Sequence, residues 1–346
     1  MASEAAENLV ELVPSGETFM ARTDETILDA ALRQGIALEY GCRHGNCSTC
    51  KHLIEEGDVD LGEASAYSLP DDEREDGWAL LCCATALTPL VIRDNREADD
   101  RAKPLLPPAE HQGTVTGIMQ LTPELWELSI SLEKPMMFYA GQFAELGLPG
   151  EGGMVWRSYS MASSPSTPSD LKFVIKRIPN GAFSGRLDTL QPGATLEVRG
   201  PFGTSYLRGG ERPVLFASIG SGLAPILSML RDARERYDGR SFTFYYGARR
   251  PFDLPYLDEI RDQLASAFGD RLRFVPTLDG LTEGDYWHGS IGTVTQAIQR
   301  DIPDAHDYDV YLCGAPAMCD TVARLLAAKG LPENQLFFDR FFPAAG

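Results

Sequence analysis

Alternating and periodic hydrophobic positions divide the chain into three segments. In residues 1–103, the alternating runs ENLVELV and TFMART flank the turn PSGE, which predicts a β-hairpin. The apolar residues of TILDAALRQG recur on one helical face, so we expect a helix that Asp24 caps and Gly35 ends. A polar loop rich in cysteine follows. The pattern predicts a small α+β domain.

The other two segments have different periodicities. Residues 104–208 hold short strand-like runs separated by Gly, Pro and Ser, which is typical of a small antiparallel barrel. In residues 209–346 strands alternate with helices, as where SFTFYYGA precedes LPYLDEIRDQLASAF, and repeated βα units predict a parallel sheet. The charged, Pro-ended stretch at 93–108 is typical of a linker between the first segment and the second.

The charge of the chain limits its partners. Over 346 residues the formal net charge is −19, which argues against nucleic acid and anionic membrane surfaces. Residues 1–103 carry most of the excess, with 22 Asp and Glu against 9 Lys and Arg. Within them, DDERED at 71–76 is either a solvated face or a docking surface for a basic partner, whose approach long-range attraction would speed.

We expect a cytoplasmic protein. MASEAAENLVEL lacks the basic and apolar blocks of a secretory signal. The longest uncharged run, 214–230, is interrupted by glycine and proline and is shorter than the roughly 20 apolar residues of a spanning helix. Cytosolic thiols stay reduced, so clustered cysteines there indicate metal binding or catalysis rather than disulfides.

Three of the seven cysteines lie close together in EYGCRHGNCSTCKH. Cys42-x4-Cys47-x2-Cys50, followed by a distant fourth cysteine at position 82 or 83, is the ligand spacing of a plant-type [2Fe–2S] cluster. The small residues in this loop let backbone N–H groups approach the sulfurs. A structural zinc site usually shows two close cysteine pairs, and only one is present. A Rieske centre needs a second Cys-His pair downstream, which the sequence lacks.

Two longer motifs add a resemblance to known families. LLCCATAL resembles the ferredoxin pattern Leu-Cys-x-Ala, which implies a β-grasp domain with Cys82 as the fourth ligand. RSYS at 157–160, with AGQF upstream and GAFSGRL downstream, resembles the flavin domain of the ferredoxin–NADP reductase superfamily, a Greek-key barrel. The resemblance implies that Arg157 neutralises the flavin diphosphate, Tyr159 lies against the isoalloxazine and Ser160 hydrogen-bonds near N5. It also implies contacts to the flavin cofactor, at the pyrophosphate above all, from Lys176, Gly181, Phe183 and Ser184.

The third segment resembles the nicotinamide domain of the same superfamily. IGSGLAP, at a strand-to-helix turn, resembles its G-T-G-hydrophobic-A-P loop, and CGAP resembles its second nicotinamide motif. The C-terminal FFDRF resembles the strand whose last aromatic shields the flavin. Ser160, Cys313 and Phe341 are therefore the expected catalytic residues, although Cys313 and Phe341 on their own also fit a buried core. The implied nicotinamide-binding residues are Gly220, Ser221, Gly222, Pro225, Gly314 and Pro316.

The choice of nicotinamide donor depends on YGARRPFDLPY, after the second strand of this segment. Arg249 and Arg250 could meet the 2′-phosphate of NADPH, whereas Asp253 could accept from a ribose hydroxyl or repel a phosphate. We expect NADH, with NADPH left open.

The order of the three segments resembles the reductase component of soluble di-iron monooxygenases, such as the methane, propane, alkene and phenol enzymes, and implies FAD. NADH delivers two electrons as hydride and an iron–sulfur cluster accepts one, so the flavin must lie between them. The expected path runs from NADH through FAD and [2Fe–2S] to a di-iron hydroxylase component. We expect a ferredoxin domain at 1–103, an FAD domain at 104–208 and an NAD domain at 209–346.

Two alternatives remain open. The acceptor could be an aromatic-ring-hydroxylating Rieske dioxygenase, whose reductases share this order of modules. The chain could also be a non-catalytic redox sensor or carrier, in which flavin and cluster only report cellular state. Rapid NADH-driven reduction of a dye or a cytochrome would distinguish the enzyme from the sensor.

Overall fold

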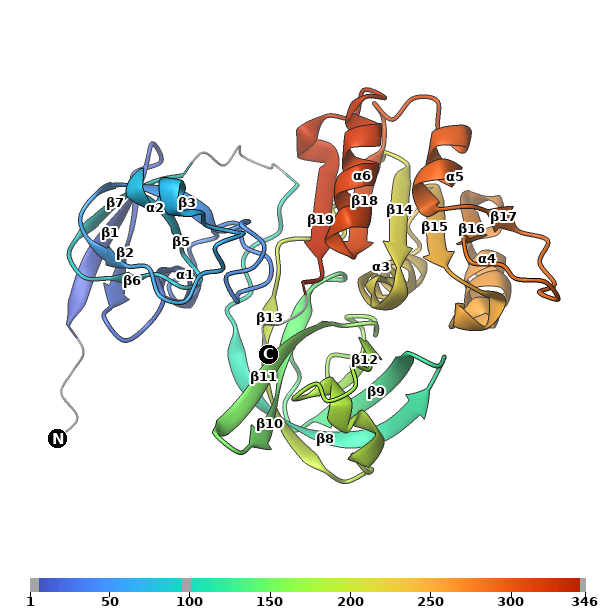
Figure 1. Cartoon of the computed structure of the whole chain (residues 1–346), viewed down its shortest axis with the longest axis horizontal. Coiled ribbons are helices and arrows are strands. Elements are labelled where there is room, and N and C mark those ends of the chain that lie inside the picture. Colours follow the sequence, from blue (N-terminus) through green and yellow to red (C-terminus); the bar gives the residue numbers. More distant parts are fainter. Residues whose placement is uncertain (1–5, 95–100, 343–346) are drawn as a thin grey trace. The chain divides into compact units, whose positions relative to one another are not determined.

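The computed structural model describes residues 6–94 and 101–342, and the chain divides into two compact units. The first unit ends at Pro108 and the second runs from Ala109 to Phe341 (Figure 1). The predicted linker at 93–108 spans this boundary, and its residues 95–100 lie outside the described part of the chain. The boundary predicted at 208 falls inside the second unit, so the division into three domains stays a prediction.

The first unit is built on a mixed sheet with the strand order β2-β1-β7-β3-β5. Strand β1 pairs antiparallel with β2, which confirms the predicted hairpin, and parallel with β7. The short strands β4 and β6 pair with each other in a separate sheet. The strands are β1 (Glu7–Val13), β2 (Glu17–Arg22), β3 (Lys51–Glu56), β4 (Val59–Asp60), β5 (Trp78–Leu80), β6 (Thr85–Ala86) and β7 (Leu90–Arg93).

Helix α1 (Ile27–Arg33) begins at a different cap from the one predicted. The Oγ1 of Thr26 accepts the N–H of Asp29 at 3.1 Å, so Thr26 and not Asp24 is the N-cap. The reason is position, because Thr26 directly precedes the first helical residue and Asp24 lies two residues too early. Gly35 has a φ of +80° and ends the helix, as expected. The α1 amide of Leu28 donates to the carbonyl of Leu81 at 2.9 Å, which ties the helix to the chain just before Cys82.

The second unit starts with an antiparallel barrel, as the sequence predicts. Its strand order is β11-β10-β13-β8-β9-β12, and an isolated bridge between Met161 and Phe173 joins the end of β11 to β12. The inward-facing residues of these strands form one apolar core. The strands are β8 (Ala109–Gln120), β9 (Leu125–Leu132), β10 (Phe143–Gly150), β11 (Gly153–Ser160), β12 (Asp170–Lys176) and β13 (Thr195–Phe202), with a short 3-10 helix η1 (Ser184–Thr189).

A parallel sheet with the order β17-β16-β15-β14-β18-β19 completes the second unit, as predicted. The chain starts at β14 in the centre, proceeds to one side through β15 and β16, and returns to the other side at β18, so the strand order reverses between β14 and β18. The strands are β14 (Val214–Ile219), β15 (Phe242–Ala248), β16 (Leu272–Leu278), β17 (Ser290–Ile291), β18 (Asp309–Gly314) and β19 (Leu336–Arg340).

Helices cover both faces of this sheet (Figure 1). Along β14, Phe216 packs in the core with α3 (Leu223–Glu235), whereas its neighbours Leu215 and Ala217 pack with α5 (Val294–Asp301) and α6 (Pro316–Ala327). The helix predicted from LPYLDEIRDQLASAF is irregular: a π-helical turn, η4 (Glu259–Leu264), leads into the short α4 (Ala265–Phe268). The short elements α2 (Asp71–Glu75), η2 (Gly220–Gly222), η3 (Pro251–Asp253), η5 (Gly269–Arg271) and η6 (Glu333–Gln335) complete the described fold.

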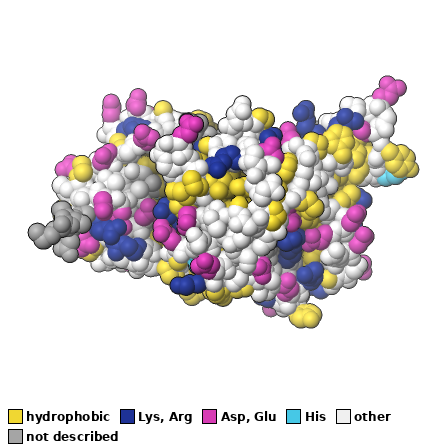
Figure 2. All heavy atoms as spheres, turned by 90° about the horizontal axis from the view of Figure 1, so that it is seen from below, with side chains coloured by type: hydrophobic (Ala, Val, Ile, Leu, Met, Phe, Trp, Pro, Cys, Tyr) yellow, Lys and Arg dark blue, Asp and Glu magenta, His cyan; other side chains and the backbone are white. Residues whose placement is uncertain are grey.

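On one face of the molecule, acidic and basic side chains are intermixed (Figure 2). On the face drawn in Figure 2, carboxylates are scattered among Lys and Arg side chains and do not gather in a single patch. Within the described residues, no helix combines the length and the hydrophobicity needed to cross a membrane.

Candidate functional site

The four predicted cluster ligands lie in the first unit and form two pairs. The Cys42 thiol is hydrogen-bonded to the Cys47 sulfur, and the Cys50 thiol is hydrogen-bonded to the Cys82 sulfur. Cys42, Cys47 and Cys50 lie on the irregular loop before β3, whereas Cys82 follows β5. Two irons bridged by sulfide need two such pairs of thiolates. Among the described residues, no three His, Cys, Asp or Glu side chains are grouped around a single metal-ion position.

Backbone N–H groups of the loop point at these sulfurs. The amides of His44 and Asn46 donate to the Sγ of Cys42 at 3.4 and 3.3 Å, and the amide of Cys42 donates to the Sγ of Cys47 at 3.3 Å. A hydrogen bond from Cys42, supported by others, lowers the pKa of Cys47 to about 6. Such donors stabilise thiolates, which are the form that binds iron.

The loop reaches this geometry through left-handed turns. Arg43, Gly45 and Ser48 have φ values of +61°, +70° and +60°. A Cβ at Gly41 would lie 3.1 Å from the Sγ of Cys47, so a larger residue would crowd the sulfur. The four-thiol set and its amide donors fit a [2Fe–2S] cluster.

Cys82 and Cys83 differ in their surroundings. Hydrogen bonds from Cys50 and Cys83, with the amide of Gly45, lower the pKa of Cys82 to about 3. Cys82 is 8% exposed, whereas Cys83 is only half-buried and its Sγ lies 3.7 Å from that of Cys82. The geometry therefore supports the choice of Cys82 as fourth ligand, which stays a prediction.

The predicted flavin residues lie at the end of β11. Arg157 is half-buried and donates to the Trp156 carbonyl at 2.8 Å. Tyr159 packs its ring 5.2 Å from that of Phe183, and burial raises its pKa above the ordinary value. Ser160 is 6% exposed, and its Oγ donates to the Oδ2 of Asp339 at 3.0 Å.

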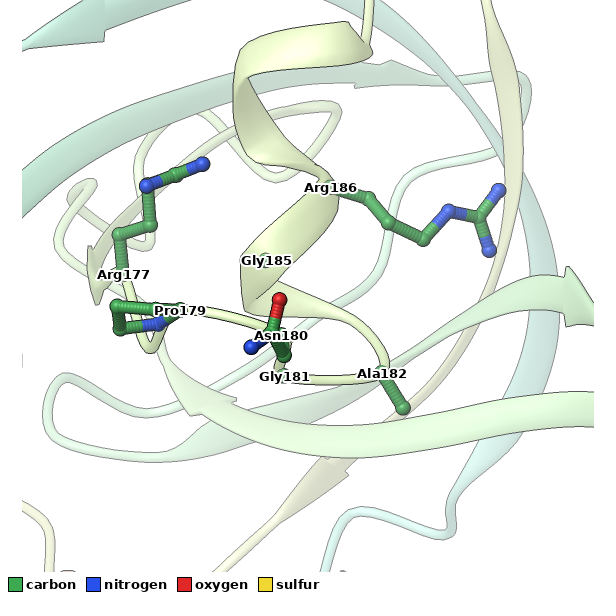
Figure 3. Close-up of a pocket in the computed structure, with 7 residues that line it drawn as sticks. All are labelled: Arg177, Pro179, Asn180, Gly181, Ala182, Gly185 and Arg186. Carbon is green, nitrogen blue, oxygen red and sulfur yellow. The ribbon is translucent and has the colours of Figure 1, made fainter.

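A pocket of about 450 Å³ opens where β12 leads into η1 (Figure 3). Figure 3 shows Arg177 and Arg186 on opposite sides of the start of this short helix, with Asn180 and Gly181 at the turn between them. Asn180 has a φ of +61°, and a Cβ at Gly181 would lie 2.8 Å from the hydroxyl of Ser184. The turn therefore needs glycine at position 181. The residues lining the pocket are Arg177, Pro179, Asn180, Gly181, Ala182, Gly185 and Arg186.

Of the three residues predicted at the pyrophosphate, Gly181, Phe183 and Ser184, only Gly181 lines this pocket, and Lys176, predicted to bind the cofactor, does not line it. Phe183 is buried in the barrel core, and the Ser184 hydroxyl accepts the amide of Ile178 at 3.2 Å. Lys176 pairs with Glu124 at 2.8 Å on the surface. Arg177, Asn180 and Arg186 were not identified as site residues from the sequence. Two arginines on either side of an Asn-Gly turn are the pattern that could have indicated them.

The two predicted nicotinamide motifs meet at the reversal point of the parallel sheet. Ser218 of β14 is paired with Cys313 of β18. A Cβ at Gly222 would lie 2.2 Å from the Cys313 carbonyl oxygen and 2.9 Å from the Gly314 Cα, so the two turns are in backbone contact. Open α/β sheets bind their ligands at this edge. Around them, Gly220 and Ser221 form η2, Pro225 lies in the first turn of α3, and Pro316 begins α6.

Asp339 connects the flavin and nicotinamide motifs and was not predicted. It lies opposite Cys313 in the β18–β19 pairing, and its carboxylate accepts the Ser160 hydroxyl. Cys313 is fully buried, and burial, together with Asp339, raises the pKa of its thiol. Its thiol therefore belongs to the core beneath the site. Phe341 is half-buried, and its amide donates to the Gly314 carbonyl at 2.8 Å.

Family comparisons cover all three predicted segments. Residues 10–88 match the 2Fe-2S iron-sulfur cluster binding domain, residues 112–206 the oxidoreductase FAD-binding domain, and residues 216–324 the oxidoreductase NAD-binding domain. Each matched range lies within the corresponding expected segment.

Curated relatives match over nearly the whole chain. The chain is 36% identical over 342 residues to the phenol 2-monooxygenase reductase component DmpP of Pseudomonas sp. (strain CF600), covering 97% of this chain and 95% of that protein. It is 38% identical over 326 residues to the propane 2-monooxygenase reductase component of Rhodococcus jostii (strain RHA1), covering 92% and 87%.

Solved structures share the fold. The Amycolatopsis cytochrome P450 reductase GcoB matches with a TM-score of 0.85 at 29% identity, covering 98% of this chain and all of that one. The ferredoxin reductase in carbazole 1,9a-dioxygenase matches with a TM-score of 0.79 at 30% identity and the same coverage. Together with the relatives above, these matches show that the chain belongs to the family of monooxygenase reductase components, oxidoreductases that pass electrons from NADH through FAD and a [2Fe–2S] cluster to an oxygenase.

Proposed function

We propose that the oxygenase served by this chain is the hydroxylase component of a di-iron monooxygenase, in the cytoplasm. The observation that carries the proposal is the 36–38% identity, over nearly the full chain, to reductase components of phenol and propane monooxygenases. The resemblance of the module order to the reductases of di-iron enzymes supports the same acceptor. The organic substrate is chosen by that hydroxylase.

The residues of the first unit would hold the last carrier of the relay. Cys42 and Cys47 would bind one iron, and Cys50 and Cys82 the other, because the thiols are already paired in this way. When bound, FAD accepts a hydride and releases its electrons singly, and the cluster accepts them singly. Amide donors on the sulfurs would lower the free energy of the reduced, more negative cluster.

The pocket at η1 would hold the pyrophosphate of FAD. Arg177 and Arg186 lie on either side of it, and Asn180 and Gly181 form the turn that lets the backbone approach. Arg177 is paired with Asp188 at 2.6 Å, which balances its charge, whereas Arg186 donates to the neutral carbonyl of Pro149 at 2.6 Å and would supply positive charge to the phosphate. Arginine suits this task because its planar fork matches phosphate oxygens.

Ser160 and Asp339 would determine which hydrogen-bond donors and acceptors face the flavin ring. The Oγ–Oδ2 distance of 3.0 Å directs the serine hydroxyl toward the carboxylate, which leaves the serine lone pairs available to accept from an N–H of the ring. Phe341, in the strand extension beyond β19, would cover the ring from water. The glycines of the two nicotinamide turns leave room for the donor to approach closely.

Helix α3 fixes these two halves of the site relative to each other. It starts at the first nicotinamide turn, and its Arg231 donates to the Ala162 carbonyl at 2.6 Å while pairing with Glu259 at 2.8 Å. Its Ser228 donates to the Ser163 carbonyl at 2.7 Å. The segment that directly follows β11 and Ser160 is thereby held against the nicotinamide domain, and hydride transfer depends on such alignment.

Reconstitution with purified acceptors tests the proposal. We expect NADH-dependent product formation with a di-iron phenol-type or propane-type hydroxylase, at a rate at least about tenfold above that with a Rieske oxygenase, because each acceptor selects its reductase surface. The Rieske acceptor is the second candidate, because a reductase of carbazole 1,9a-dioxygenase shares the fold at a TM-score of 0.79. Faster turnover with the Rieske oxygenase would overturn the proposal, and no turnover with either would favour a sensor.

A further inference from the structure

An arginine–aspartate pair lies at the end of β15, where the sequence predicts contact with the ribose of the nicotinamide donor. Arg250 lies two residues after the end of β15, and Asp285 lies on the loop after β16. The Arg250 Nε donates to the Asp285 Oδ2 at 3.1 Å, and its Nη2 donates to Oδ1 at 2.8 Å. This two-bond geometry occupies the Nε–Nη2 edge of the guanidinium, one of the edges that can match a phosphate, and balances its charge with a carboxylate.

Asp285 is held in place from its own side. Both the amide and the hydroxyl of Thr282 donate to its Oδ2, at 2.8 and 3.1 Å, and its own amide donates to the Thr282 carbonyl at 3.0 Å. Its side chain is only 10% exposed, and the bond from Arg250 helps to lower its pKa to about 2. The carboxylate is therefore charged and fixed throughout the working pH range.

Arg250 is held by further contacts. Its guanidinium lies over the ring of Phe252, 4.8 Å from the centroid, and its amide donates to Asp253 at 3.1 Å. The loop that carries Asp285 runs along the end of β15, because the Gly280 amide donates to the Arg249 carbonyl at 2.9 Å. Arg250 is thus committed to protein partners on several sides.

The position of the Arg250–Asp285 pair bears on which nicotinamide donor, NADH or NADPH, the site favours. Strand β15 adjoins β14, whose end carries the first nicotinamide turn. In dinucleotide-binding sheets, the residues after the second strand meet the adenosine ribose, where an acidic residue favours NADH and a nearby arginine accommodates the 2′-phosphate of NADPH. Arg250 is in the right place for that phosphate but is already neutralised.

We propose that Asp285 is a specificity residue that acts through Arg250, keeping its guanidinium engaged so that the site favours NADH over NADPH. A 2′-phosphate would have to break two charge-assisted bonds to use the Nε–Nη2 edge of Arg250. At any other edge it would meet a guanidinium whose charge is already balanced, with the Asp285 carboxylate nearby as a like charge. Arg249 is exposed at the same strand end and contributes equally with and without Asp285. The inference rests on the proposed reductase function and names what selects its donor.

The test is Asp285→Asn in the full-length holoprotein, read as the ratio of the second-order rate constant of anaerobic flavin reduction by NADPH to that by NADH. Asparagine keeps an acceptor for the Thr282 amide but leaves Arg250 at most a neutral bond. One charge-assisted bond to a phosphate predicts that the ratio rises about tenfold or more. In parallel, 2′,5′-ADP should gain affinity relative to 5′-ADP in calorimetric titrations.

Two matched variants separate this mechanism from a general loss of negative charge. Asp279→Asn removes an exposed carboxylate from the same loop without releasing Arg250, so the ratio should stay at the wild-type value. When Asp285→Asn is combined with Arg250→Gln, the ratio for NADPH over NADH should return to the wild-type value. Should Asp285→Asn fail to fold, Asp285→Ser keeps a short oxygen acceptor for Thr282 and carries the same expectation.

An unchanged ratio in a folded Asp285 variant would overturn the inference, and so would an equal rise in Asp279→Asn. These outcomes leave the proposed function intact, because wild-type NADH turnover with the hydroxylase is measured separately. Absence of flavin reduction by NADH in the wild type would instead contradict the proposed function itself.

Discussion

At the residue scale, the two adjacent cysteines after β5, Cys82 and Cys83, differ in their contacts at the cluster site. The sulfur of Cys82 is paired with Cys50 and receives the amide of Gly45, whereas the sulfur of Cys83 lies 3.7 Å beyond that of Cys82. A Cβ at Gly45 would lie 2.8 Å from the Cys83 Sγ, so the loop passes close to both sulfurs. Cys83 is more exposed than Cys82 and is also hydrogen-bonded to it, so Cys83 lies beside the Cys50–Cys82 pair.

This difference predicts opposite results for two serine variants. Cys82→Ser should lose most of the visible cluster absorbance and the electron paramagnetic resonance signal of the reduced protein, because serine replaces a thiolate ligand. Cys83→Ser should keep both signals. If Cys82→Ser kept both signals and Cys83→Ser lost them, Cys83 and not Cys82 would be the fourth cluster ligand.

The site residues that the sequence predicted belong to short motifs, whereas those that it missed are paired with residues distant in the sequence. The cysteine spacing, the GSG turn and CGAP each lie within a few residues, so the sequence alone indicated them. Ser160 and Asp339 are 179 residues apart, and Arg250 and Asp285 are 35 apart, so their pairing depends on the order of strands in the sheets. Periodicity predicts that strands exist but does not fix which strand ends become neighbours.

At the element scale, α2 presents exposed carboxylates on the surface of the first unit. Asp71 and Asp72 open this helix and are exposed, with the Asp71 side chain 95% accessible. Glu73 differs, because both of its carboxylate oxygens lie 2.7 Å from the Lys51 Nζ, and it holds α2 against β3. A docking role within DDERED would therefore fall to the exposed carboxylates.

Reversing the charge of Asp71 and Asp72 to lysine should slow electron transfer to the hydroxylase about fivefold or more at low salt, with little effect at high salt, because screened charges steer weakly. Stopped-flow measurement of cluster reoxidation by the hydroxylase checks this. Glu7→Lys with Glu11→Lys, on β1, makes the same change in net charge and serves as the control. If electron transfer slowed equally in both double variants, α2 would be an ordinary solvated helix with no docking role.

Secondary structure itself was predicted unevenly, for physical reasons. The central strands of the parallel sheet are continuous apolar runs bounded by glycine, and the sequence indicated them directly. Strand β17 has two residues and was missed, because so short a run has no periodicity. The segment at 254–268 shows a helical pattern, and Ile260 and Leu264 pack in the core as that pattern predicts, but residues 259–264 form a π-helical turn that the pattern does not indicate.

At the scale of the whole molecule, the division of the chain into two compact units matches a division of labour. The second unit contains the barrel and the parallel sheet, joined by the Ser160–Asp339 bond and by α3, so hydride acceptance is contained within one unit. The first unit contains all four predicted cluster ligands and its own core. Loss of the cluster should therefore leave flavin reduction intact.

The most direct test of the relay is anaerobic stopped-flow mixing of Cys47→Ser with NADH, beside the wild type. The account predicts that the variant folds, loses the cluster absorbance, bleaches its flavin at a rate within about twofold of wild type, and no longer reduces cytochrome c or the hydroxylase. Failure of NADH to bleach the flavin in the folded variant, or undiminished electron delivery without the cluster, would contradict the order NADH, FAD, [2Fe–2S], oxygenase.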